Sequence, residues 1–195
     1  LHLACISNDP SSDLNPKLTK SINLDCFSKL VDIAKNNNFK RFIFASSSSV
    51  YGLSNSKNIR ENHRLKPLTL YSEYKVVCEK ILLSKTDDNF VGVIFRPATV
   101  CGYSRRLRLD LTVNILTNFA YNKNLINVFG GKQLRPNLHI LDYCDVVNIL
   151  IKEKDSVIKN QIFNVGYQNL SVSKIANVVS KTTSIFKNKK RKLKI

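Results

Sequence analysis

Short, wholly apolar segments alternate with longer segments of helical periodicity, and this alternation most constrains the fold of the chain. Residues 42–45 and 90–95 contain no polar side chain, as expected of parallel strands that helices cover on both faces. Residues 14–37 and about 71–84 place apolar side chains at helical spacing. Residues 161–165 follow as the last predicted strand. The sequence therefore predicts an α/β fold with a doubly wound parallel sheet.

The two ends of the chain bound its organisation. Residues 1–6 are predicted to be the end of a further buried strand, and residues 185–195 a disordered basic tail. The 195 residues suffice for one domain with a substantial core, and no run of about twenty apolar residues could span a membrane. Because no methionine occurs and the N-terminus is a strand end, we interpret the chain as a piece of a longer one.

Charge and cysteine content exclude several classes of site. The net charge of +17 suggests nucleic-acid binding, but the densest basic run, at 187–194, has no interleaved aromatic side chains, so we do not expect that partner. The five cysteines are dispersed, without a Cys-x-x-Cys pair. This pattern predicts reduced thiols in a cytoplasm and neither a disulfide framework nor a metal site. They are Cys5, Cys26, Cys78, Cys101 and Cys144.

Tyr71 and Lys75 are the first candidate chemical pair. Residues four apart on a helix share a face, and a nearby ammonium group favours the phenolate of a tyrosine, which can then remove a proton from a hydroxyl. A surface pair on an amphipathic helix is the alternative. The serine run 46–49 directly follows the strand at 42–45, at the sheet edge where open α/β sheets bind ligands.

The sequence resembles the extended short-chain dehydrogenase/reductases and, within them, the NAD-dependent nucleotide-sugar epimerase/dehydratase family. The similar motifs follow the family's order over nearly the whole chain: residues 2–4, Asn23, residues 42–52, Tyr71 with Lys75, residues 96–102 and residues 133–140. The resemblance implies part of a Rossmann-like sheet over residues 1–184. Segments of a small substrate lobe, at about 97–140 and 167–184, would be interleaved with it.

The family's chemistry assigns roles to these residues. Tyr71 would act as the base on a sugar hydroxyl, Ser47 would hydrogen-bond the same oxygen, and Lys75 would hold the cofactor ribose. The implied cofactor-binding residues are Leu3, Ala4, Asn23, Ser46, Tyr71, Lys75, Arg96 and Pro97. The implied substrate-binding residues are Ser47, Ser48, Thr99, Asn114 and Arg135. The alternatives are a cap or turn former for Ser47 and solvated charges for Arg96 and Arg135.

The resemblance also implies the reaction. The cofactor would be NAD rather than NADP, the substrate a nucleotide sugar, and the complete enzyme a cytoplasmic homodimer through the helices at 14–37 and 71–86. Related dehydratases carry an acidic residue one or two positions after the active serine or threonine, where this chain has Ser48 and Ser49. We therefore favour 4-epimerisation. A dehydratase, a reductase, or a non-catalytic remnant with an anion-binding tail are the alternatives.

The family's Gly-x-x-Gly-x-x-Gly cofactor motif does not occur among the six glycines of the chain. The similarity begins at the family's fourth strand, so we expect that the 195 residues alone do not bind NAD detectably and present a bare strand edge. Arg105, Arg106 and Arg108 are a further candidate phosphate contact. His63 and His139 are interpreted as a loop residue and a packing residue.

Overall fold

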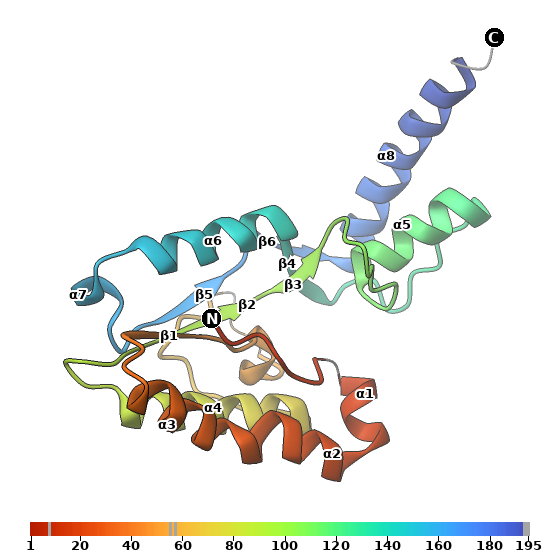
Figure 1. The fold of residues 1–195 in the computed structure, drawn as a ribbon. Helices are drawn as coiled ribbons and strands as arrows, with labels where there is room; N and C mark the ends of the chain where they lie inside the picture. Colours follow the sequence, from red (N-terminus) through yellow and green to blue (C-terminus); the bar gives the residue numbers. More distant parts are fainter. Residues whose placement is uncertain (8, 55, 57, 193–195) are drawn as a thin grey trace. The chain divides into compact units, whose positions relative to one another are not determined.

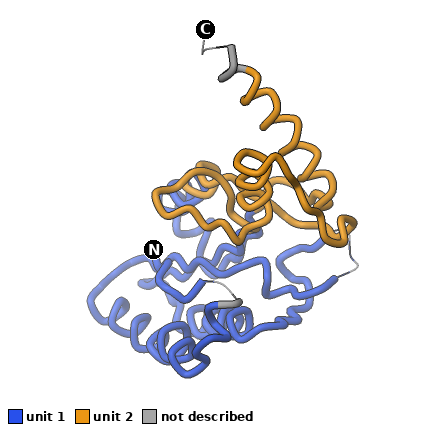
Figure 2. Tube along the Cα trace, turned by 90° about the vertical axis from the view of Figure 1, so that its right-hand side faces the viewer, with its two compact units in different colours: residues 1–97, 145–165 blue, residues 98–144, 166–195 orange. Residues whose placement is uncertain are grey.

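A computed structural model describes residues 1–7, 9–54, 56 and 58–192. The chain divides into two compact units (Figure 2). Unit 1 consists of Leu1–Pro97 and Asp145–Val165, and unit 2 consists of Ala98–Cys144 and Gly166–Ile195. Each unit therefore contains two segments that are distant in the sequence.

The sheet of unit 1 is parallel. It contains β1 (Arg41–Ala45), β2 (Val91–Pro97) and β5 (Ile162–Val165), in the order β1-β2-β5. Phe44 lies opposite Ile94 in the first pair of strands. This arrangement confirms the predicted α/β class with parallel strands, and all three strands begin within one residue of their predicted starts.

Helices flank this sheet (Figure 1). The elements of unit 1 are α1 (Asp9–Leu14), α2 (Pro16–Lys20), a π-helical turn η1 (Ser21–Asp25), α3 (Cys26–Asn36), a 3-10 turn η2 (Ser48–Tyr51), α4 (Leu70–Lys85) and α7 (Asp155–Ile158); α6 (Ile140–Lys152) begins in unit 2 and ends in unit 1. Between β1, β2 and the helices α3 and α4 lies the main core, whose buried members are Phe27, Val31, Phe42, Phe44, Cys78, Leu82, Phe90 and Ile94.

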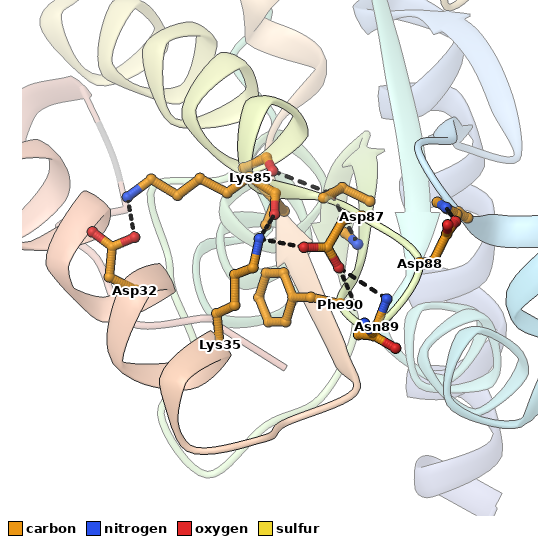
Figure 3. A network of polar contacts seen from close by, with 11 residues as sticks. Asp32, Lys35, Lys85, Asp87, Asp88, Asn89 and Phe90 are labelled. Carbon is orange, nitrogen blue, oxygen red and sulfur yellow. Dashed lines mark hydrogen bonds and ion pairs between the residues drawn. The ribbon is translucent and has the colours of Figure 1, made fainter.

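Two lysines join α3 to the C-terminal end of α4 (Figure 3). Lys85 on α4 donates to the Ser28 hydroxyl (2.8 Å) and to Asp32, both on α3. Lys35 on α3 donates in the opposite direction, to the carbonyl oxygen of Lys85 (2.8 Å), and pairs with Asp87 in the following loop. The reciprocal contacts hold the two helices side by side over the sheet.

The N-terminal segment differs from the prediction. Residues 1–6 do not form a buried strand: the segment pairs with β1 only at His2, which bridges Phe44, and the side chains of Leu1 and Leu3 are 53% and 50% exposed. A strand is buried when sheet or helix covers both its sides, and among the described residues this segment has a sheet neighbour on the β1 side only.

Unit 2 has its own small sheet and core. The strands β3 (Thr99–Cys101), β4 (Leu134–His139) and β6 (Gln168–Ser171) are ordered β3-β4-β6, parallel in the first pair and antiparallel in the second. Helices α5 (Thr112–Lys123) and α8 (Val172–Lys192) pack together through a buried cluster. Its members are Leu116, Ala120, Val172, Ile175, Ala176 and Val179.

The tail prediction is wrong for residues 185–192, which continue α8; residues 193–195 lie outside the described part. The lysines and arginine there are good helix formers, so an established helix can extend through them. Within the described residues, no helix is both long and apolar enough to cross a membrane, and no group of His, Cys, Asp or Glu side chains could hold a metal ion.

Candidate active site

The serine run at the end of β1 divides into a buried and a turn-forming part. Ser46 is 3% exposed, and its hydroxyl donates to the carboxylate of Glu79 (2.5 Å). Ser47 is the N-cap of η2, where its Oγ accepts from the amide (3.1 Å) and the hydroxyl (2.9 Å) of Ser49. Ser47 is thus a turn former, as its alternative interpretation stated. Its own O–H remains a donor, so the catalytic prediction stays open to test.

Helix α4 carries Tyr71, Lys75 and Glu79 at intervals of four residues, hence on one face. The helix begins where the sequence provides a capping box: the Thr69 hydroxyl accepts from the Ser72 amide (3.3 Å), and the Ser72 hydroxyl accepts from the Thr69 amide (3.1 Å). This cap sets the register of the helix, and with it the face on which the three side chains lie.

Lys75 points back to the end of β1. Its Nζ donates to the carbonyl oxygen of Ala45 (2.7 Å) and lies 4.7 Å from the ring centroid of Phe44 and 5.6 Å from that of Tyr71. The residue is only 6% exposed. Burial disfavours the charged form and lowers the pKa of Lys75. The predicted Tyr71–Lys75 proximity is therefore present, with the lysine buried and the tyrosine half-buried.

Asn23 acts on the N-terminal segment. Its Oδ1 accepts from the amide of Ile6 (2.8 Å), and its Nδ2 donates to the carbonyl of the same residue (3.0 Å). The Cys78 thiol of α4 donates to the Asn23 carbonyl (3.2 Å), and burial raises the pKa of Cys78 to about 12, which keeps this donor protonated. Asn23 therefore fixes residues 1–6 against η1 and α4. In this structure its side chain contacts protein backbone.

Arg96 is not a solvated charge, and this alternative interpretation is wrong. Its side chain is 2% exposed and forms a two-point ion pair with Glu79, with Nε to Oε1 at 2.9 Å and Nη2 to Oε2 at 2.6 Å. Its Nη1 donates to the Tyr51 hydroxyl (2.7 Å) and the Glu61 carbonyl (2.9 Å). Four of the five guanidinium N–H groups are thus used within the protein. A cofactor contact of Arg96 stays a prediction.

Glu79, Tyr51 and Asn164 were not singled out from the sequence. The Tyr51 hydroxyl donates to Oδ1 of Asn164 (2.6 Å) on β5, so the buried network crosses the whole sheet of unit 1. One signal existed for Glu79: it follows Lys75 by four residues, which places a carboxylate on the same helical face. No local pattern marks Tyr51 or Asn164, because their partners are distant in the sequence.

The predicted site residues fall into both units. The cofactor-side residues, including the exposed Leu3 and Ala4 and the partly buried Pro97, lie in unit 1 with Ser47 and Ser48. Three of the predicted substrate contacts, Thr99, Asn114 and Arg135, lie in unit 2. Thr99 opens β3, Asn114 is buried in α5 and donates to the Arg108 carbonyl (2.9 Å), and Arg135 is exposed on β4.

The structure also describes the surroundings of His63, His139 and the arginine cluster. His63 lies in the loop after η2, with its ring 6.2 Å from that of Tyr51. His139 is exposed at the end of β4, where its ring lies against Gly102 and its Nδ1 accepts from the amide of Leu141 (3.3 Å). Of the arginine cluster, Arg108 forms an ion pair with Asp110 (2.6 Å).

Comparison with known proteins places the chain among related sequences. A model of the NAD dependent epimerase/dehydratase family matches residues 1–166. A UDP-glucose 4-epimerase of Lactobacillus helveticus is 25% identical over 200 residues, which cover 92% of this chain and 61% of that protein. The uncharacterized UDP-glucose epimerase YtcB of Bacillus subtilis (strain 168) is 28% identical over 159 residues, 80% of this chain and 49% of that protein.

The fold also matches solved structures. One is an NAD dependent-NDP-hexosamine 5,6-dehydratase, TunA, involved in tunicamycin biosynthesis, with a TM-score of 0.81 and 24% identity over 94% of this chain and 60% of that one. At this identity the likeness concerns the fold alone. The chain spans about half to three-fifths of the length of the relatives named here.

Proposed function

The chain belongs to the NAD dependent epimerase/dehydratase family, and from this we propose that its protein is a nucleotide-sugar 4-epimerase of the UDP-glucose 4-epimerase type. Both curated relatives named above carry that kind of name. One observation carries the proposal. Lys75, four residues after Tyr71, is anchored to the carbonyl of Ala45, two residues before Ser47. This hydrogen bond connects the helix of Tyr71 and Lys75 to the strand end from which the Ser47 turn begins.

In the proposed mechanism, Tyr71 removes the proton from a sugar hydroxyl and later returns it. Ser47 supports the same oxygen. Because its Oγ already accepts two hydrogen bonds from Ser49, its own O–H is the group that it can direct to the substrate. Lys75 keeps positive charge beside the Tyr71 ring whenever it is protonated, which favours the phenolate.

The residues present suit the nicotinamide-ribose side of an NAD molecule. An ammonium group has three N–H donors, and the Ala45 carbonyl accepts one, so Lys75 has donor capacity for a ribose hydroxyl. Tyr71 would share this contact. Leu3 and Ala4 are exposed apolar residues of the N-terminal segment, which Asn23 holds in place through its two hydrogen bonds to the backbone of Ile6. NAD, when bound, would take up and return the hydride of the sugar carbon.

Two features support epimerisation over elimination of water. The positions after Ser47 are Ser48 and Ser49, which belong to the η2 turn and supply no carboxylic acid. The carboxylate that does contact the serine run, Glu79, is bound at both oxygens by Arg96. Both oxygens of this buried carboxylate are occupied by contacts within the protein, so Glu79 is not placed to serve a substrate as an acid. No acid for dehydration is therefore provided at this turn.

Unit 2 is proposed to contact the nucleotide sugar. Arg135 is exposed on β4, and a guanidinium matches diphosphate oxygens with two parallel hydrogen bonds. Thr99 and Asn114 would contribute from β3 and α5. The predicted substrate segments, about 97–140 and 167–184, correspond closely to the residues of unit 2. We therefore propose unit 2 as the substrate-binding part.

The test is turnover of UDP-glucose and UDP-galactose by the protein expressed from its whole reading frame, with NAD supplied. We expect interconversion of the two sugars, and a loss of about 10²–10⁴-fold in kcat for Tyr71→Phe, because the base is removed. Tyr74→Phe, on the same helix, is the matched control and should retain activity. A 4-keto-6-deoxy product would instead assign a dehydratase, and an active Tyr71→Phe variant would refute the proposed base.

A further inference from the structure

A buried ion pair lies behind the serine turn, and the proposed mechanism does not use it. The Glu79 side chain is 3% exposed and that of Arg96 2% exposed, and both carboxylate oxygens are occupied. Oε1 accepts from Ser46 and from Arg96, while Oε2 accepts from Arg96 alone among the described contacts. Replacing a buried ion pair by apolar residues of similar volume is often neutral or stabilising, so stability alone is a weak reason for such a pair.

The pair holds both ends of the turn that begins at Ser47. At the start, Glu79 accepts the hydroxyl hydrogen of Ser46, the residue directly before Ser47. At the end, Arg96 donates to the hydroxyl of Tyr51, the last residue of η2 (2.7 Å). A turn of four residues held at both ends by one rigid salt bridge has little freedom to rotate its N-cap.

The same carboxylate also sets the turn against helix α4. Lys75 bonds the carbonyl of Ala45, and Glu79, one helical turn further, bonds the side chain of Ser46. Successive residues of the strand end are thus bound by successive turns of the helix that carries Tyr71. Two contacts of this kind fix both the distance and the angle between helix and strand end, which one contact could not do.

We propose that Glu79, with Arg96, is a positioning residue that sets the Ser47 hydroxyl against the Tyr71 hydroxyl. The role rests on the proposed function of Ser47 and Tyr71. Neither Glu79 nor Arg96 touches substrate in this role. They act through Ser46 and Tyr51, which carry the two ends of the turn. Misplacement of a catalytic group by about 1 Å can lower a rate by about 10²-fold, so these contacts bear on kcat.

The test is a double-mutant cycle on the protein expressed from its whole reading frame. Ser46→Ala removes only the link to the turn and leaves the Glu79–Arg96 pair intact. Tyr51→Phe removes the link at the other end, together with the hydrogen bond of the Tyr51 hydroxyl to Asn164. We expect each to lower kcat by about 10–100-fold with less than about a threefold change in KM for the nucleotide sugar. Ser84→Ala, an exposed serine on α4, is the matched control and should leave kcat unchanged.

The effect of Ser46→Ala in the absence of the Ser47 hydroxyl distinguishes a positioning role from a general disturbance of the fold. In a Ser47→Ala background, Ser46→Ala should lower kcat less than about twofold, because the group that it positions is already gone. Losses that multiply in the double variant would overturn the proposal. So would a loss confined to the KM for NAD, since Ser46 would then contact the cofactor directly.

Glu79→Gln gives a second line of evidence. Its amide oxygen can still accept from Ser46, so kcat should fall less than in Glu79→Ala at a temperature where both variants are folded by circular dichroism. Equal losses in the two would count against the role. If the wild-type protein turns over no nucleotide sugar, the proposed function itself is wrong. An active wild type with uncoupled variants refutes the positioning role alone.

Discussion

Lys75 has an ammonium group that is almost entirely removed from water. At 6% exposure it lies between the Phe44 ring, the Tyr71 ring and the Ala45 carbonyl. Desolvation is the largest cause of its lowered pKa, and nearby thiols and Glu79 oppose it. A lysine held this way can lose its proton at lower pH than a solvated lysine, so its charge beside Tyr71 is pH-dependent.

This predicts a pH dependence of stability that Lys75 alone contributes. Because the folded-state pKa lies below the ordinary value of 10.5, the unfolded chain binds more protons between the two values, and stability rises with pH in that window. Urea unfolding measured from pH 7 to 10 gives the free energy of unfolding of both proteins. The wild-type value minus the Lys75→Met value should rise with pH, by at most about 1.4 kcal/mol per pH unit. Lys80→Met, at an exposed site on the same helix, is the control. Parallel curves for wild type and Lys75→Met would contradict the prediction.

At the scale of elements, α3 and α4 depend on contacts made at the C-terminal end of α4 as well as on the apolar core. The Lys85 ammonium makes three contacts on α3. Two are with the Ser28 carbonyl (3.1 Å) and the Ser28 hydroxyl (2.8 Å), and the third is with Asp32 (Figure 3). These fix the helix that carries Tyr71 at the end opposite to its capping box. The helix is thus restrained at both termini.

Lys85→Met should therefore lower the free energy of unfolding by about 1 kcal/mol, since it removes a partly exposed ion pair and a hydrogen bond to a hydroxyl. Denaturation in urea at pH 7 measures the change. Lys29→Met, at an exposed lysine of α3, provides the comparison and should change the stability by less than about 0.5 kcal/mol. Equal effects of the two substitutions would show that the contacts across the helix pair contribute nothing measurable.

The exposed apolar side chains of residues 14–37 and 71–86 bear on the predicted homodimer. Leu14, Leu18, Ile22 and Val77 are 85%, 49%, 39% and 40% exposed, respectively. The first three are spaced by four residues over α1, α2 and η1. Dimerisation through these helices stays a prediction, and sedimentation of the protein expressed from its whole reading frame tests it.

At the scale of the whole molecule, two cores share one chain that crosses between the units repeatedly. Unit 1 is built around the parallel sheet, and unit 2 around the contact of α5 with α8. The cofactor-side residues lie in the first and three of the predicted substrate residues in the second. A division of this kind lets the two sets of contacts vary separately in sequence.

Separate cores predict separate responses to damage. Ile175 is 4% exposed in the core of unit 2, so Ile175→Ala should destabilise that unit by roughly 2–5 kcal/mol. Hydrogen exchange should then show lost protection in α5 and α8, with the amides of β1 and β2 still protected. Val178→Ala, at a 53% exposed site on the same helix, serves as the control. Uniform loss of protection in both units would show a single cooperative structure.

The sequence predicted most of unit 1 because its elements are marked locally. The apolar runs at 42–45 and 90–95 became β1 and β2, and the helix of Tyr71 and Lys75 begins at the capping box of Thr69 and Ser72. Unit 2 was predicted less well. β6 and β3 were not anticipated. Its strands are short and half-exposed. They form through backbone pairing with neighbouring strands, and apolar periodicity in the sequence does not mark them.

The sequence by itself determined the α/β class, the family and the Tyr71–Lys75 spacing, because apolar periodicity, ordered motifs and helical geometry are local properties. Only the tertiary structure decided that Lys75 is buried, that Asn23 holds Ile6, and that Arg96 pairs with Glu79. The sequence around an arginine does not show whether its side chain is solvated or paired with a carboxylate. Its surroundings come from segments 17 to 45 residues away, which the fold alone brings together.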